Sequence, residues 1–455
     1  MHSRLLFAMS RSNLPAISVA CVLAAVSLTA CGQASGSAPG PGGDAAADVA
    51  TGDGAADAAT GDGAVDASDG GAADAAGPDA ASCNPGQLAV CGRGAAGIDC
   101  AISAGSASFG PLVTEQAGFS DGALWNGSPS YYGTIQFPDV DGDGRADVCG
   151  RGSAGVDCAL SSGASFGALG TWQAGFSDAA SWGSAPAYWA TIRFPDVDGD
   201  GKADVCGRGT AGIQCALSSG QSFAAMTVWQ ADFSDAQKWG SLPAYWATIQ
   251  FPDVDGDGKA DVCGRGVAGI RCALSDGTAF GVSSVWQADF GDAAQWSGSA
   301  SYYATIQFPD VNGDGKADVC GRGAGGIRCA LSDGTSFGAS SVWQADFGDA
   351  AGWGSSPAYW ATIQFPDVDG DGKADVCGRG VAGIRCAVSD GGSFGTSTVW
   401  QPDLGGAADD GGAGGASWGL EAYYATIQFP LLTAGDCPRR RGAMPMLRFM
   451  QRLGN

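Results

Sequence analysis

The chain has 455 residues, is rich in glycine, and carries 47 acidic against 23 basic residues, which gives a net charge of -24. This acidity argues against a nucleic-acid partner, because binding to a phosphate backbone needs a basic surface. The single histidine, His2, lies in a segment that we expect to be removed on export. Without histidine no Ser-His-Asp or Cys-His centre can form, and no unrepeated acidic pair stands out, so we expect the protein not to be an enzyme.

The N-terminus is typical of an export signal. Arg4 and Arg11 precede an apolar run over residues 17–30, which is too short and wrongly flanked for a membrane-spanning helix. The run ends in Leu-Thr-Ala-Cys, which resembles the lipobox of bacterial lipoproteins. The resemblance implies a signal peptide over residues 1–30 and lipidation of Cys31, whereas the alternative is an ordinary signal peptide followed by an unrelated cysteine. We expect an exported protein, lipid-anchored in the bacterial cell envelope at the outer membrane or cell surface.

Residues 31–82 consist almost entirely of Gly, Ala, Asp, Ser, Thr and Pro. Such a segment has almost no large apolar side chains to bury, so we expect a disordered linker. Aromatic and β-branched residues return from Cys83 onward, and the folded part is expected to begin there.

The rest of the chain repeats with a period of 57 residues. In the copy that begins at Asp196, residues 203–208 and 213–218 flank a turn and predict a β-hairpin. Residues 222–229 predict a third strand, and residues 245–251 alternate well enough to predict a fourth. Four strands in such a unit, with no helical period, are typical of a propeller blade.

The number of blades follows from two recurring signatures. A Cys-Gly-Arg-Gly segment with a second cysteine nine residues after the first occurs six times, and a strand that ends in Phe-Pro also occurs six times. We therefore predict an all-β fold, a β-propeller of six four-stranded blades over residues 83–430. The basic tail at residues 431–455 lacks the acidic loop that the period calls for, so it is either an unstructured extension or the remnant of a seventh blade.

An acidic loop, Asp-x-Asp-Gly-Asp-Gly-x-x-Asp, starts five of the repeats, with Asn312 replacing the second Asp in one of them. A hydrophobic strand follows each loop, and a turn of the form Ser-Asp-Gly-x-x-Phe-Gly comes later in several repeats. On these motifs, residues 83–430 resemble the FG-GAP/VCBS family of calcium-binding β-propellers. The resemblance implies a propeller that binds calcium at the start of each blade, although paired cysteines are not part of the general family pattern.

The chemistry of the acidic loop also favours calcium. Ca²⁺ takes six to eight oxygen ligands, and alternate aspartates in a glycine-bent loop can converge on one ion. In one copy we expect the side chains of Asp196, Asp198, Asp200 and Asp204 and the backbone carbonyl of Lys202 to bind. An EF-hand is excluded because the flanks are strands and the twelfth position is glycine. We expect about five Ca²⁺ that stabilise the fold rather than bridge a ligand. The matching ligands elsewhere are Asp139, Asp141, Asp143, Arg145 and Asp147; Asp253, Asp255, Asp257, Lys259 and Asp261; Asp310, Asn312, Asp314, Lys316 and Asp318; and Asp367, Asp369, Asp371, Lys373 and Asp375, where each Arg or Lys contributes its carbonyl.

Fourteen of the 16 cysteines remain after Cys21 in the signal and Cys31 are set aside. An even number in an exported chain predicts disulfides, and zinc is disfavoured because the spacing is not C-x-x-C and no histidine remains. We expect Cys83 and Cys437, which flank the repeats, to close the propeller as a further bond. The six pairs spaced nine residues apart are Cys91 with Cys100, Cys149 with Cys158, Cys206 with Cys215, Cys263 with Cys272, Cys320 with Cys329, and Cys377 with Cys386.

The segment between the third and fourth predicted strands is rich in aromatic residues and is the candidate binding surface. Aromatic faces stack on sugars, and repetition would give several equal sites and avidity, so a glycan is the first expected partner and an envelope protein the alternative. The other interpretation is that these aromatic rings pack neighbouring blades together. The candidate ligand-binding residues are Trp182, Trp189, Trp239, Trp246, Trp296, Trp353 and Trp360.

Overall fold

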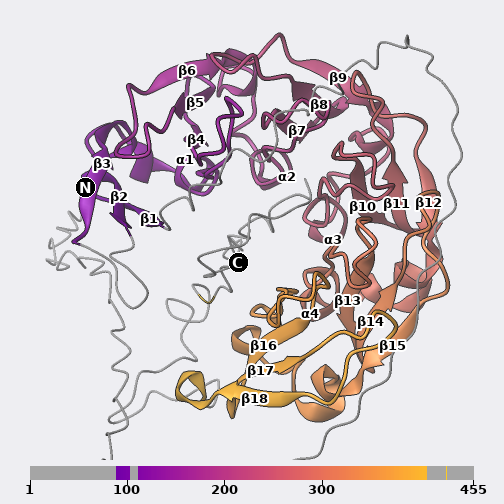
Figure 1. Ribbon diagram of the computed structural model, residues 1–455. Helices are drawn as coiled ribbons and strands as arrows, with labels where there is room; N and C mark the ends of the chain where they lie inside the picture. The colour runs from indigo at the N-terminus through magenta and orange to yellow at the C-terminus, as the bar shows by residue number, and fades with distance from the viewer. Residues whose placement is uncertain (1–88, 103–110, 407–426, 428–455) are drawn as a thin grey trace, which may run out of the picture. The chain divides into compact units, whose positions relative to one another are not determined.

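The computed structural model describes residues 89–102, 111–406 and 427. All of the described residues belong to one unit of the chain, Gly77–Asn455. Within them the fold is all-β and consists of six three-stranded antiparallel sheets, each built from strands consecutive in the chain (Figure 1). Short helical turns follow the third strand of every sheet.

The strands are β1 (Ala89–Gly94), β2 (Gly97–Ile102), β3 (Val113–Gln116), β4 (Val148–Arg151), β5 (Val156–Ala159), β6 (Gly170–Gln173), β7 (Val205–Gly209), β8 (Gly212–Ala216), β9 (Thr227–Gln230), β10 (Val262–Gly266), β11 (Gly269–Ala273), β12 (Ser284–Gln287), β13 (Val319–Gly323), β14 (Gly326–Ala330), β15 (Ser341–Gln344), β16 (Val376–Gly380), β17 (Gly383–Ala387) and β18 (Thr398–Gln401). The α-helical turns are α1 (Pro129–Tyr132), α2 (Pro186–Trp189), α3 (Pro243–Trp246), α4 (Ala300–Tyr303) and α5 (Pro357–Trp360). The 3-10 turns are η1 (Ala117–Phe119), η2 (Trp125–Gly127), η3 (Ala174–Phe176), η4 (Ala231–Phe233), η5 (Ala288–Phe290), η6 (Asp292–Ala294), η7 (Trp296–Gly298), η8 (Ala345–Phe347), η9 (Asp349–Ala351) and η10 (Pro402–Leu404).

The hairpin predicted in each repeat is present. In the third sheet β7 pairs antiparallel with β8, with Cys206 opposite Cys215 and Gly209 opposite Gly212 at the turn. Gly212 has φ +121°, and a Cβ there would come within 2.1 Å of the carbonyl oxygen of Gln230. The turn therefore needs glycine, because the third strand passes directly over it.

The fourth predicted strand is largely absent, and this corrects the expectation of four-stranded blades. Residues 243–246 form the helical turn α3, and only Gln250 pairs with a strand, as an isolated antiparallel bridge to Cys263. Pro243 is the cause, since its fixed φ suits the first position of a helix. The Ala247 N–H then donates to the Pro243 carbonyl at 3.0 Å and closes the turn.

The bridge joins each repeat to the following sheet, because Cys263 belongs to β10 and not to the sheet of β7–β9. Equivalent bridges pair a glutamine or arginine with the first cysteine of the next sheet. They are Gln136–Cys149, Arg193–Cys206, Gln307–Cys320 and Gln364–Cys377.

Hydrogen bonds also cross between neighbouring sheets. The Ser218 hydroxyl donates to the Val140 carbonyl at 2.6 Å, and Gln250 Nε2 donates to the Ile306 carbonyl at 3.0 Å. One hydrophobic cluster accordingly contains Trp229 and Trp239 from one repeat with Val262 and Phe280 from the next. Much of the core is therefore made between repeats, so a single repeat could not bury its apolar face alone.

Candidate metal loops and inter-repeat groove

Each acidic loop is folded around the carboxylate of its first aspartate. In the second loop, Asp196 Oδ1 accepts from the Gly199 N–H at 2.7 Å, and its Oδ2 accepts from the Gly201 N–H at 3.0 Å. Gly199 and Gly201 have φ of +77° and +87°, a conformation that glycine adopts readily. The alternating glycines thus allow the loop to bend tightly while its aspartates stay on the inside.

The last aspartate of the loop ties it to the sheet. Asp204 is fully buried, and its two oxygens accept from the Val197 N–H at 3.0 Å and the Ser218 N–H at 2.6 Å. Burial raises the pKa of Asp204 to about 8 and that of Asp261 to about 8, against the lowering effect of the two backbone N–H groups. The pKa of Asp318 rises to about 7 and that of Asp147 to about 6 for the same reason.

The loops bring together groups of three carboxylates that could hold a cation. Asp196, Asp198 and Asp204 each offer an oxygen within 4.8 Å of the others. Asp200 is not one of the three and pairs with Lys202, Oδ2 to Nζ at 2.5 Å. The donor set is all oxygen and suits a hard cation such as calcium. The other three groups are Asp139, Asp141 and Asp147; Asp253, Asp255 and Asp261; and Asp367, Asp369 and Asp371.

The other predicted ligands form the same hydrogen bonds and ion pairs as their counterparts in the second loop. In the fourth loop Asp310 accepts from the Gly313 N–H at 2.7 Å and Asn312 Oδ1 from the Asp314 N–H at 3.0 Å, as in the other loops. Asp143, Asp257, Asp314 and Asp371 each pair with the basic residue two positions later, as Asp200 does. These partners are Arg145, Lys259, Lys316 and Lys373, whose carbonyls were the predicted ligands.

The six predicted cysteine pairs are disulfides in the structure, and each joins the first strand of a sheet to the second. In each hairpin the two cysteines lie directly opposite, with Cα atoms 4.1–4.2 Å apart. The bonds are Cys91 to Cys100, Cys149 to Cys158, Cys206 to Cys215, Cys263 to Cys272, Cys320 to Cys329, and Cys377 to Cys386. The second cysteines lie on β2 (Cys100), β5 (Cys158), β8 (Cys215), β11 (Cys272), β14 (Cys329) and β17 (Cys386).

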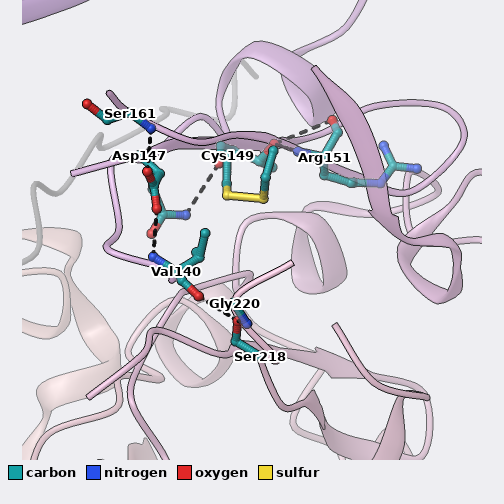
Figure 2. Close-up of a disulfide and its surroundings, with 10 residues drawn as sticks. Val140, Asp147, Cys149, Arg151, Ser161, Ser218 and Gly220 are labelled. Carbon is teal, nitrogen blue, oxygen red and sulfur yellow. Dashed lines mark hydrogen bonds between the residues drawn. A yellow bond between two sulfur atoms is a disulfide. The ribbon is translucent and has the colours of Figure 1, made fainter. Parts of the chain in front are cut away.

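Figure 2 shows one of these disulfides at Cys149, beside Asp147 and its hydrogen bonds to Val140 and Ser161. The disulfide and the last aspartate of the acidic loop therefore brace the start of the same hairpin. The predictions for Cys31, Cys83 and Cys437 lie outside the described residues, as do those for residues 1–30, 31–82 and 431–455.

The arginine of each Cys-Gly-Arg-Gly segment is a structural residue. Arg208 is fully buried, its Nε donates to the Phe233 carbonyl at 2.9 Å, and its Nη1 donates to the Ala187 carbonyl at 3.2 Å. Nη2 forms an ion pair with Asp235, and the guanidinium lies 5.6 Å from the ring centroid of Tyr188. The carboxylate partner therefore comes from the turn after η4 and not from an acidic loop.

The seven candidate tryptophans are buried, which corrects the expectation that they offer faces to a sugar. Their exposed fractions are only 4–8 %. Trp239 packs on Phe233 with ring centroids 4.5 Å apart, and it also covers Gly264 of the next sheet, where a Cβ would come within 2.9 Å of the ring. Trp182, Trp296 and Trp353 cover a glycine of the next sheet in the same way. The seven buried tryptophans are Trp182, Trp189, Trp239, Trp246, Trp296, Trp353 and Trp360.

A surface groove of about 280 Å³ lies where two repeats meet. Tyr188, at the end of α2, donates its hydroxyl proton to Asp235 Oδ2 of the next repeat at 2.6 Å. Lys238 is exposed at the rim of the groove, and Ala185 and Ser241 also line it. Tyrosine, carboxylate and ammonium groups side by side can bind a small polyhydroxylated molecule. Sequence reasoning missed these residues.

The tyrosine–aspartate bond recurs between other neighbouring repeats, always 47 residues apart. It joins Tyr131 to Asp178 at 2.5 Å, Tyr245 to Asp292 at 2.7 Å, and Tyr302 to Asp349 at 2.5 Å. Tyr131, Tyr188 and Tyr302 are partly exposed, whereas Tyr245 is buried. Leu242 replaces Ala185 at the Tyr245 copy, and the larger side chain leaves less room.

Comparison with known proteins supports a repeat-based fold. Residues 310–378 match the FG-GAP-like repeat family. The chain is similar to a lectin from Agrocybe aegerita whose structure concerns recognition of non-reducing terminal N-acetylglucosamine, with 27 % identity, a TM-score of 0.62, and 70 % of this chain and 78 % of that one covered. Comparison with curated proteins gives no significant match.

Two further solved structures are similar over part of the chain. They are the Photorhabdus luminescens Tc holotoxin pore (16 % identity, TM-score 0.39, 59 % of this chain and 12 % of that one) and the V. cholerae biofilm matrix protein Bap1 (17 %, 0.29, 58 % and 38 %). Their TM-scores are too low to inform function. Among the described residues no helix is both long and apolar enough to cross a membrane.

Proposed function

We propose that the protein is a calcium-stabilised, non-enzymatic propeller that binds carbohydrate at several equivalent grooves. The observation that carries the proposal is the similarity to the Agrocybe aegerita lectin, at 27 % identity over 70 % of the chain. The groove at Tyr188 supports it, because its hydroxyl, carboxylate and ammonium groups suit the hydroxyls of a sugar. Repetition of this arrangement would give avidity toward a polysaccharide without any single tight site.

The ligand-binding role moves from the buried tryptophans to the partly exposed tyrosines. Tyr131, Tyr188 and Tyr302 each lie beside an aspartate of the next repeat, whose carboxylate is held in place by an arginine. A carboxylate with two fixed partners keeps lone pairs available at a defined position, which suits hydroxyl recognition. An aromatic ring next to it provides an apolar contact for the sugar ring.

The test is binding of the calcium-loaded full-length chain to immobilised glycans with terminal N-acetylglucosamine. Binding is expected to fall at least tenfold in the triple variant Tyr131→Ala, Tyr188→Ala and Tyr302→Ala, because loss of each contact weakens avidity multiplicatively. Val282→Ser is a matched control, since Val282 is 92 % exposed and lies outside the groove. Unchanged binding by the folded triple variant, checked by its melting temperature, would reject these grooves. Absence of glycan binding together with capture of an envelope protein would favour adhesion.

We also propose calcium as the cation of the acidic loops and the cell envelope as the location. The oxygen-only donor sets support calcium, and the lipobox-like sequence at Cys31 supports a lipid anchor. Metabolic labelling with a fatty acid tests the anchor. Label should be incorporated into the natural chain and lost in Cys31→Ala; equal labelling of the two would exclude it.

A further inference from the structure

We propose that the groove at Tyr188 accepts an anionic sugar residue, one that carries a carboxylate or sulfate group, while the equivalent positions at Tyr131 and Tyr302 accept neutral sugars. This inference rests on the proposed carbohydrate-binding function and assigns a ligand class to one of its sites. It follows from one position at which each of these repeats carries a different residue.

That position is the third residue after the groove aspartate. Its backbone is fixed: the Lys238 N–H donates to the Asp235 carbonyl at 2.9 Å, and the Ser241 N–H donates to the Lys238 carbonyl at 3.1 Å. The residue takes a left-handed conformation, with φ of 67° at Ser181, 65° at Lys238 and 82° at Gly352. Glycine would be the least strained choice, so the side chains at the other copies are held against a backbone preference.

The side chains at this position give the grooves different charges. The charge of Asp235 in the groove is formally cancelled by its ion pair with Arg208, and the same holds for the equivalent pairs in other copies. Lys238 adds one positive charge at the rim, whereas Ser181 and Gly352 add none. Lys238 is exposed and makes no salt bridge with any residue in the described ranges, so its ammonium is available to a ligand. The Lys238 ammonium is therefore a local positive charge on a chain whose net charge is -24.

The size of the groove limits the ligand to a small group. Its volume of about 280 Å³ is near the lower end of ligand pockets, which run from about 300 to 1,000 Å³. One terminal sugar residue fits that range better than a long oligosaccharide. An anionic substituent on such a residue would meet the Lys238 ammonium at the rim while its hydroxyls face Asp235 and Tyr188.

The experiment is calorimetric titration of the calcium-loaded full chain with two probes, the methyl glycosides of N-acetylglucosamine and of glucuronic acid. We expect the glucuronide to bind at one site, with affinity about tenfold lower in Lys238→Gln, because a charge-assisted hydrogen bond is lost. Binding of the neutral glycoside at the other grooves should not change in that variant. Sodium acetate at the same concentration should compete only weakly, which separates an anionic sugar from a bare carboxylate.

A gain-of-function variant provides the matched control. Gly352 has the same left-handed backbone, and a Cβ placed there meets no atom within 4 Å, so Gly352→Lys meets no clash and carries only the backbone strain that Lys238 already bears. It should create a second glucuronide site in the Tyr302 groove. The inference is overturned if Lys238→Gln binds the glucuronide as well as the natural chain does, or if only the neutral glycoside binds. Failure of both glycosides to bind would overturn the proposed function itself.

Discussion

Arg208 combines a charge with complete burial, and its partners explain how the fold tolerates this. Its hydrogen bonds reach a helical turn, the carbonyl of Phe233 and the carboxylate of Asp235, all outside its own strand. A buried guanidinium is costly unless every donor finds a partner, and lysine cannot present the same planar fork. The same set of contacts, apart from the carboxylate at the last copy, recurs at Arg151, Arg265, Arg322 and Arg379.

Arg208→Lys is expected to lower the free energy of unfolding by about 2–3 kcal/mol, because charge-assisted hydrogen bonds are lost and buried acceptors are left unsatisfied. Arg385→Lys is the control, since the Arg385 side chain is 33 % exposed and its loss should cost under about 1 kcal/mol. Chemical denaturation of the calcium-loaded protein measures both. Equal shifts in the denaturation midpoint would show that burial of Arg208 is not what matters.

The buried aspartates of the loops predict how the metal-free protein responds to pH. Burial raises the folded-state pKa of Asp204 and Asp261 to about 8, from an ordinary value of 3.8. The folded state therefore holds protons that the unfolded state releases, so this contribution to stability is complete below about pH 4 and is lost as the pH rises toward 8. Exhaustively metal-free protein should melt at a higher temperature at pH 5 than at pH 8. A melting temperature that instead rises with pH would contradict the assignment.

At the scale of elements, the hairpin turn leaves no room for a side chain at Gly212. Gly212→Ala places a Cβ against the Gln230 carbonyl and forces the third strand away, at a cost of about 1–3 kcal/mol. Gly298→Ala is the control, because a Cβ at Gly298 meets nothing within 4 Å. The free energies of unfolding of the two variants, measured by denaturation, should differ by more than about 1 kcal/mol. A control as unstable as Gly212→Ala would refute the steric explanation.

The disulfides stabilise the hairpins by closing short loops. Replacing Cys206 and Cys215 together by serine should lower the free energy of unfolding by about 2.5–3 kcal/mol, if the stabilisation comes from restricting the unfolded chain. The effect should disappear when the natural chain and the double variant are both compared under reducing conditions. A difference that persists after reduction would assign the effect to packing of the serine side chains.

Features that depend on residues close together in the chain could be predicted from the sequence. Features that depend on contacts with another repeat could not. The turn between residues 208 and 213 and the nine-residue cysteine spacing are local, so the hairpins and disulfides are present as expected. Residues 245–251 alternate like a strand, but Pro243 starts a helical turn instead. The burial of Trp239 depends on Gly264 in the following repeat, which no single repeat reveals.

The groove left a signal in the sequence that could have been found. A tyrosine and an aspartate recur 47 residues apart across repeat boundaries, and the residue three positions after the aspartate differs in every copy. Comparing the repeats with one another, position by position, would have singled out Ser181, Lys238 and Gly352. A site that is built from residues of two repeats cannot be found by examining the sequence pattern of a single repeat.

For the whole molecule, calcium is expected to link the loops to overall stability. Each ion that binds only the folded state adds about 2.7 kcal/mol when calcium is at a hundred times its dissociation constant. Calcium should therefore raise the melting temperature, and elemental analysis should find about five ions per chain. Asp196→Ala should remove one of them without unfolding the protein. No bound calcium and no change in melting temperature would leave the loops without a metal role.

Pairing across repeat boundaries has a consequence for how such a chain can change in length. The end of each repeat is held by the first strand of the next sheet, and the contact of Gln364 Nε2 with the Ile427 carbonyl at 2.7 Å repeats the one between Gln136 and Ile192. Removing or inserting a segment of 57 residues between equivalent points would therefore recreate junctions of a kind that the protein already contains. Unequal recombination between the similar repeats could thus change the number of repeats, and with it the number of proposed binding sites, without requiring a new interface.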